Sequence, residues 1–91
     1  MATSNIPVPY VISAILLSNC NDAKICGRNY YCDSNTANRP TGSGWWHLHC
    51  IGNSGVMTAQ IAVQMNATAF VMYGRVSNSA GTFGNWTKII G

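Results

Sequence analysis

Two adjacent segments rich in β-forming residues constrain the fold of this chain most. Residues 59–65, "AQIAVQM", alternate aliphatic side chains with Gln and Ala, and a period of two is typical of a strand with two different faces. Residues 69–77, "AFVMYGRVS", are also rich in β-formers, and only "NAT" separates the two runs. The pair predicts an antiparallel hairpin.

Further strands flank this hairpin. Residues 45–51, "WWHLHCI", predict a strand that a turn at 52–57 joins to the hairpin, and residues 86–90, "WTKII", predict a terminal strand. The apolar run at 8–17 predicts a first strand, because it is about half as long as the roughly twenty residues of a membrane span. Residues 16–27 can hold one helical turn, capped by Ser18 or Asn19. We expect one face of strand 45–51 in the core and one outside it, the first with Trp46, Leu48 and Cys50, the second with Trp45, His47 and His49.

Composition limits the partners of the chain. Ninety-one residues make one small domain, which is marginally stable without oligomerisation, disulfides or a metal. Charged residues are 8% of the chain, and five scattered basic residues against two acidic ones exclude the basic stripe of a nucleic-acid binder. The many Asn, Ser, Thr and Gly residues favour a neutral, hydrogen-bonding exterior that suits glycans.

Neither face of segment 59–65 carries a charge. A strand of this kind packs on both faces, or lies near a symmetry axis where Gln side chains from several chains meet. We therefore predict a homo-oligomer.

Four cysteines leave two redox states open. An even number in a short chain permits two disulfides with three connectivities, whereas a protein assembled in a reducing cytoplasm keeps its thiols free, the state that we favour. The spacing does not match the closely spaced pairs of a zinc knuckle. The cysteines are Cys20, Cys26, Cys32 and Cys50.

His47 and His49 lie two residues apart and point to the same side of their strand. Two ligands per chain do not close a zinc site, but a threefold axis would bring six nitrogens together, an arrangement suited to iron or nickel. The alternative is a pair of histidines hydrogen-bonded across strands. We predict no cofactor, with this axial metal ion as the alternative.

The residues for catalysis are sparse. The chain has no Glu, and a glycosidase pair would have to come from Asp22 and Asp33, both in turns. Cys50 points away from both histidines of its strand, and no glycine-rich loop leads from a strand into a helix. We predict that the protein is not an enzyme.

The order and spacing of three segments resemble a known family of domains. The segments are 27–51, 57–65 and 69–89, and together they resemble the C-terminal knob domain of bacteriophage tail fibres and of R-type pyocin fibres, over roughly residues 18–90. The chain departs from that family in its four cysteines and in "HLH", where aliphatic residues are more usual. The matching positions are Gly27, Tyr30, Tyr31, Thr36 through Gly44, Trp45, Trp46, Thr58, Gln60, Tyr73, Arg75 and Trp86.

The resemblance implies an all-β homotrimeric knob, mainly an antiparallel sheet or sandwich with at most one short helical turn. It implies that residues 1–17 are an N-terminal strand and connection to the fibre shaft, and that 18–91 form the receptor-binding domain. Such a knob is located in the virion, at the distal end of the tail fibre. It attaches the particle to a host-surface glycan, lipopolysaccharide or wall polymer, without catalysis, nucleic-acid binding or membrane insertion. The start at Met1 suggests a fragment from which the shaft was removed.

Aromatic, Arg and Asn side chains are the expected receptor contacts, because aromatic faces stack on sugar rings while Arg and Asn bind hydroxyls and phosphates. We favour the loops 35–44 and 78–85. Trp46 and Trp86 are expected in the core instead, and Arg75 could form a salt bridge to Asp22 or Asp33. The candidates are Trp45, Tyr73, Arg75, Asn85, Asn38 and Arg39.

Two other functions remain as alternatives. One is a trimerisation or capping domain that folds the fibre without binding a receptor. The other is a small, disulfide-stabilised secreted lectin.

Overall fold

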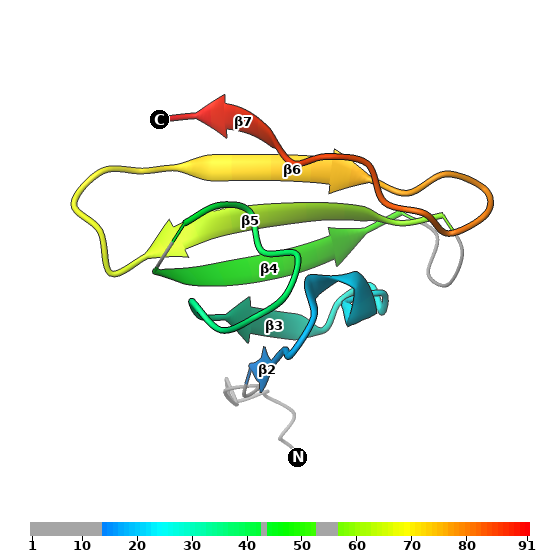
Figure 1. Ribbon diagram of the computed structural model, residues 1–91, viewed down its shortest axis with the longest axis horizontal. Helices are drawn as coiled ribbons and strands as arrows, with labels where there is room; N and C mark the ends of the chain where they lie inside the picture. The colour runs from blue at the N-terminus through cyan, green and yellow to red at the C-terminus, as the bar shows by residue number, and fades with distance from the viewer. Residues whose placement is uncertain (1–13, 43, 53–56) are drawn as a thin grey trace, which may run out of the picture.

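The computed structural model describes residues 14–42, 44–52 and 57–91, and this part of the chain forms one six-stranded sheet (Figure 1). The strands follow each other in chain order across the sheet, and every neighbouring pair is antiparallel except β2 and β3. This confirms the all-β, mainly antiparallel prediction. The strands are β2 (Ile15–Leu16), β3 (Asn29–Cys32), β4 (Trp45–Ile51), β5 (Ala59–Met65), β6 (Met72–Val76) and β7 (Thr87–Ile90).

The predicted hairpin is present as β5 and β6. The bounds of β4 and β5 match the two alternating segments, whereas β6 is shorter than the predicted 69–77 run. The connection between β5 and β6 therefore spans 66–71 rather than three residues. It begins with Asn66, whose φ of 57° lies in the left-handed region. Asn is one of the few residues other than Gly that adopt this conformation readily.

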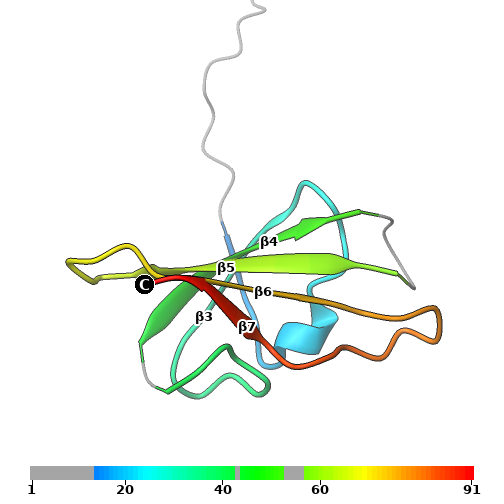
Figure 2. The same ribbon diagram turned by 90° about the horizontal axis from the view of Figure 1, so that it is seen from above.

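Loops, not a second sheet, cover one face of the sheet. The 3₁₀ turn η1 (Cys20–Asp22) and the loop between β3 and β4 lie on the same side (Figure 2). Asn19 caps η1 by accepting a hydrogen bond from the Asn21 backbone N–H at 2.9 Å, which confirms the predicted helical turn and one of its two candidate caps. A β-bridge between Asn19 and Ala37 joins the two covering segments.

The core lies between this loop layer and the sheet. Trp46, Leu48 and Cys50 are buried, as their alternation in β4 predicted, and Trp46 packs edge-to-face on Tyr73 with ring centroids 5.5 Å apart. The Trp46 indole N–H has no hydrogen-bond partner among the described residues. The other buried apolar residues are Leu17, Cys20, Ala23, Tyr30, Cys32 and Ala62.

Gln60 is buried in the core of its own chain. Its Nε2 donates to the backbone oxygens of Cys20 at 2.7 Å and Ala23 at 2.9 Å, while its Oε1 accepts from Arg75 Nε at 2.9 Å. Because the amide is satisfied on both sides, it can be fully buried without leaving an orphan polar group. One sequence expectation placed the Gln side chains of this strand at a symmetry axis between chains. For Gln60 that expectation is wrong, because its side chain is buried within its own chain.

The opposite face of the sheet is open within the described part of the chain. It carries the aliphatic side of β5 and both histidines of β4, in register so that His49 lies opposite Ile61 and His47 opposite Val63. Trp45, Met65 and Val76 on this face are 46%, 50% and 64% exposed. A hydrophobic sheet face this open is typical of an interaction surface. Strand β7 closes the sheet at one edge, with all four residues exposed.

Predictions for the first 17 residues fall largely on residues 1–13, which lie outside the described residues, as do 53–56 of the predicted turn and residue 43 of the first contact loop. Within the described part of the predicted first strand, Ile15 and Leu16 form β2. No helix in the described residues is long and apolar enough to cross a membrane.

The buried amide of Gln60 gives a stability prediction. Replacing Gln60 with Leu leaves two backbone carbonyls and the Arg75 Nε–H without their partner, so we expect a loss of about 3 kcal/mol in the free energy of unfolding. Gln64→Leu, four residues along on the same strand face, is the matched control and should change it by less than about 1 kcal/mol. Urea unfolding measures both, and equal losses would contradict the role given to Gln60.

Candidate binding cleft

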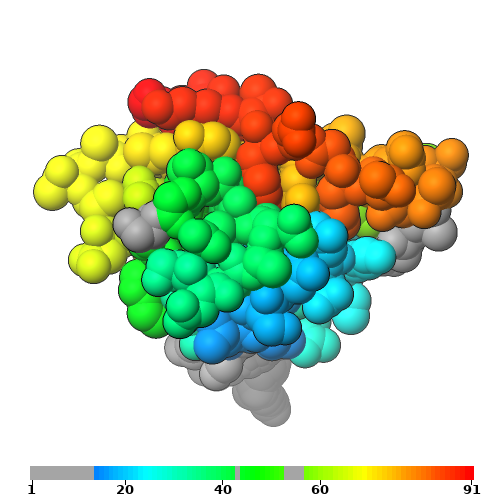
Figure 3. All heavy atoms as spheres, in the orientation of Figure 1, coloured from blue at the N-terminus to red at the C-terminus, as the bar shows by residue number. Residues whose placement is uncertain are grey.

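A polar cleft opens where three segments distant in sequence meet: η1, the β3–β4 loop and the β6–β7 connection. These segments border one another on the face shown in Figure 3. The cleft has a volume of about 450 Å³. Its lining residues are Asn21, Asn38, Arg39, Arg75, Gly81, Thr82, Phe83, Gly84, Asn85 and Trp86.

Arg75 enters the cleft from strand β6. The side chain is 9% exposed, with Nε donating to Gln60 Oε1 and Nη2 donating to Asn21 Oδ1, both at 2.9 Å. Its hydrogen-bond partners are thus neutral amides rather than Asp22 or Asp33. Burial lowers the pKa of the guanidinium, but Arg keeps its charge at neutral pH.

Two aromatic rings flank the Arg75 guanidinium. Its Cζ lies 4.1 Å from the ring centroid of Phe83 and 4.5 Å from that of Trp86, close enough for cation–π attraction to both. A turn positions Phe83: the Gly84 N–H donates to the Val76 carbonyl at 3.0 Å. The guanidinium is therefore fixed by planar contacts as well as by hydrogen bonds.

The β3–β4 loop is tied to the same ring. The Trp86 indole N–H donates to the Asn38 carbonyl at 2.9 Å, and Asn38 Nδ2 donates to Asn19 Oδ1 at 3.0 Å. Arg39 holds its own loop through donation to the carbonyls of Thr36 and Gly42. One wall of the cleft is thus fixed to the other through Trp86.

The cleft brings four of the six predicted contact residues together: Asn38, Arg39, Arg75 and Asn85. They come from both of the predicted contact loops and from β6. Trp86, expected in the core, is partly buried and packs against it while also lining the cleft.

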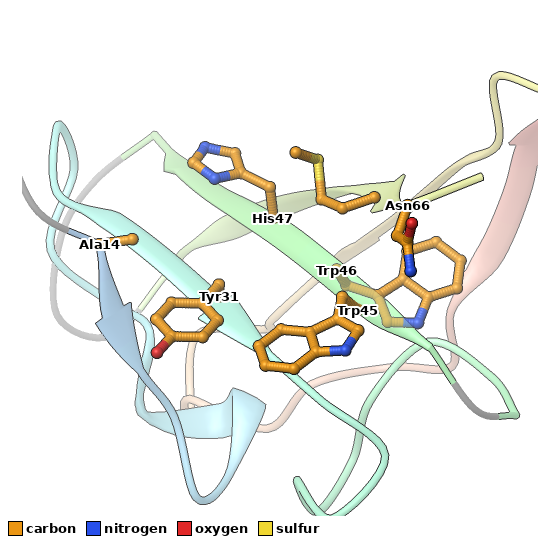
Figure 4. A pocket seen from close by; sticks show the side chains of 7 residues that line it. Ala14, Tyr31, Trp45, Trp46, His47 and Asn66 are labelled. Carbon is orange, nitrogen blue, oxygen red and sulfur yellow. The ribbon is translucent and has the colours of Figure 1, made fainter. Parts of the chain in front are cut away.

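The other two candidates lie elsewhere. Tyr73 is partly buried against Trp46, and Trp45 is on the open face, stacked on Tyr31 with centroids 5.7 Å apart and an interplanar angle of 11°. The Trp45 and Tyr31 rings lie next to each other in Figure 4. Together with His47 they line a second, mainly apolar cleft of about 510 Å³. Its lining residues are Ala14, Tyr31, Trp45, Trp46, His47, Met65 and Asn66.

Six of the ten residues that line the polar cleft were not among the sequence candidates: Asn21, Gly81, Thr82, Phe83, Gly84 and Trp86. Thr82 and Phe83 fall within the predicted contact loop 78–85, so the sequence indicated their segment but not these residues individually. Asn21 lies in the turn that was predicted only as a helical segment. Its role depends on the approach of β6, 54 residues away in sequence.

Metal ligands do not cluster in the described residues. His47 and His49 share one side of β4, and no group of three His, Cys, Asp or Glu side chains comes together among the residues that the structure describes.

The polar cleft is positively charged. Its lining has two guanidinium groups and no carboxylate. Two of their nitrogens, Arg39 Nη2 and Arg75 Nη1, make no hydrogen bond within the described part of the chain. With the amides of Asn38 and Asn85, the cleft suits a ligand that has hydroxyl groups and a negative charge.

A comparison with models of protein families, with curated proteins and with solved structures finds no match to this chain.

The Arg75 contacts give a second stability prediction. Arg75→Lys keeps the charge but loses the planar group that serves Gln60, Asn21 and the two rings, so we expect a loss of about 2 kcal/mol in the free energy of unfolding. Arg28→Lys, at an exposed position, is the control and should be nearly neutral. Urea unfolding compares them, and a neutral Arg75→Lys would refute the anchoring role.

Proposed function

We propose that this protein is the receptor-binding tip of a phage or phage-tail-like tail fibre, and that its polar cleft binds a host-surface glycan, lipopolysaccharide or wall polymer. The observation that carries the proposal is the Arg75 guanidinium held over Phe83 and Trp86 between two loops. The resemblance of the sequence to fibre knobs favours the same function. We expect binding without catalysis.

The lining of the cleft favours a saccharide. Asn38, Thr82 and Asn85 offer exposed amide and hydroxyl groups, which bind sugar hydroxyls, and the rings of Phe83 and Trp86 provide apolar surface beside them. Binding sites for small molecules combine few oriented polar groups with aromatic surface in this way. The rigid attachment of both loops lowers the entropy cost of binding.

The charge of the cleft favours an acidic saccharide. Arg39 and Arg75 each have a terminal nitrogen available for a carboxylate or phosphate oxygen, and charge-assisted hydrogen bonds of this type are about twice as strong as neutral ones. Uronic acids and phosphorylated sugars of surface polymers have such groups.

The open face of the sheet supports a homotrimer. Trp45, Ile51, Met65 and Val76 lie on this face and are 40–64% exposed. Contact with two further copies of the chain would bury this surface and supply the core area that a 91-residue domain lacks. The fibre is the structure in which such a trimer would be located, at the distal end in the virion.

Two alternatives make different predictions. A capping domain would trimerise through the open face but leave the polar cleft without a ligand. A secreted lectin would bind glycan as a monomer or dimer and depend on disulfides.

Receptor binding can be tested by adsorption of the purified domain to host cells and to a glycan array. Asn85→Ala and Thr82→Ala remove side-chain groups from the cleft rim, and we expect each to weaken binding about tenfold, since a lost hydrogen bond to a charged or polar ligand costs about 1.4 kcal/mol. Ser34→Ala, exposed and outside both the cleft and the predicted contact loops, is the matched control.

Three outcomes are distinct. Specific adsorption that both rim variants weaken supports the proposal. Specific adsorption that neither variant changes places the receptor site elsewhere, and no specific adsorption favours the capping alternative.

The trimer is tested by sedimentation equilibrium. We expect a mass three times that of the 9.8 kDa chain, and Val76→Glu should reduce it to the monomer because it places a charge on the apolar open face, at a side chain that is 64% exposed. Ser79→Glu, in an exposed loop, is the control and should remain trimeric. A wild-type monomer would contradict the trimer, and a trimer that is indifferent to reductant would contradict the lectin.

A further inference from the structure

The four cysteines, spread over 31 residues of sequence, lie in the fold as two neighbouring pairs. Cys20 begins η1 and Cys32 ends β3, and both side chains are fully buried in the same core cluster. Each thiol shifts the pKa of the other, raising that of Cys20 and lowering that of Cys32, because the two side chains lie close together. Cys20 therefore lies beside Cys32 where the covering segment meets the sheet.

The second pair lies at the other end of β3. Strands β3 and β4 are antiparallel with Asn29 opposite His49, so the chain that leads into β3 runs beside the end of β4. The Cys26 thiol donates to the Gly52 carbonyl at 2.7 Å, two residues after Cys50, and its proximity contributes to the raised pKa of Cys50. Cys50 is buried and Cys26 is exposed.

All four thiols are free in this structure. Of the three connectivities that four cysteines allow, one joins each cysteine to its neighbour in the fold. The other two join each cysteine to a partner in the other pair.

We propose that the protein is built to form two disulfides, Cys20–Cys32 and Cys26–Cys50, by thiol–disulfide exchange with a small-molecule disulfide. The bonds would attach η1 to β3 and the following turn to β4. The proposal is independent of the ligand in the polar cleft.

Cys26 is the entry point for exchange in the folded protein. Its exposed sulfur, as the thiolate, attacks the small-molecule disulfide, forms a mixed disulfide and releases one thiolate. The Cys50 sulfur loses its proton to solvent and attacks Cys26, which forms the protein disulfide and releases the second thiolate. Two protein thiols are oxidised and one small disulfide is reduced to two thiols.

The pKa of Cys50 and the burial of Cys20 and Cys32 determine which disulfide forms first. Burial, together with the adjacent Cys26 thiol, raises the pKa of Cys50 to about 11, so Cys50 is a poor first attacker. Cys20 and Cys32 are 0% exposed, so their exchange requires an open or unfolded chain. We therefore expect Cys26–Cys50 to form in the folded protein and Cys20–Cys32 to form during folding.

Peptide mapping of the full chain tests the connectivity. The denatured protein is refolded with oxidised and reduced glutathione, alkylated, and digested with trypsin and an Asp-specific protease. Trypsin does not cut at Arg39 because Pro40 follows it, so each cysteine falls in its own fragment: 1–21, 25–28, 29–32 and 33–75. We expect 1–21 linked to 29–32, and 25–28 linked to 33–75.

Any other linkage, or four alkylated cysteines after this treatment, would overturn the proposal. Cys26→Ser is the matched variant: it alters an exposed residue and should retain the 1–21 to 29–32 link while Cys50 becomes alkylated. A Cys26→Ser protein that loses both links would overturn independent pairing.

Two measurements on folded material test the order. Oxidised glutathione added to the folded, reduced protein should link only 25–28 to 33–75, and linkage of 1–21 there would contradict the burial argument. The doubly bridged protein should melt at least about 10 °C above the reduced one, because both loops restrict the unfolded chain. Equal melting temperatures would contradict a built-in stabilising role.

Discussion

The hydrogen bond between Gln60 and Arg75 connects the two layers of this small fold. Gln60 reaches from the middle of the sheet to two backbone carbonyls of the covering segment, and its oxygen holds the Arg75 side chain. A loop layer has few regular backbone hydrogen bonds of its own to fix it on a sheet. The amide supplies that connection, and a buried amide tolerates no other arrangement once its partners are in place.

The same connection determines where the polar cleft lies. Arg75 can lie over Phe83 and Trp86 because Gln60 and Asn21 hold it in one plane, and Trp86 in turn is bonded to the β3–β4 loop through Asn38. Folding and the proposed recognition therefore use the same side chains. The rim residues Thr82 and Asn85 are the ones that can vary without disturbing this frame.

Much of the fold follows from local patterns. The alternation in 45–51 and 59–65 predicted β4 and β5 with their bounds, and Asn19 before Cys20 predicted a capped turn. Alternation cannot show which face is buried. The sequence left open whether both faces of 59–65 pack or whether the strand lies near a symmetry axis. In the structure the Gln60 and Ala62 side is the buried one, because the carbonyls that satisfy Gln60 come from a segment about 40 residues earlier.

The site was predictable only in part for a related reason. Loop composition indicated two of the three segments that line the polar cleft and three of its residues, Asn38, Arg39 and Asn85. Residue type did not indicate which aromatic rings would join them: Trp45 points to the open face and Tyr73 packs on Trp46. Those outcomes depend on strand parity and on long-range contacts, which no local window contains.

The three tryptophans occupy three environments: Trp46 in the core, Trp45 on the open face and Trp86 at the cleft. Indole emission responds to polarity, so folding and the proposed association and ligand binding each have their own optical reporter within one chain. The protein thus contains the probes with which its separate equilibria can be resolved.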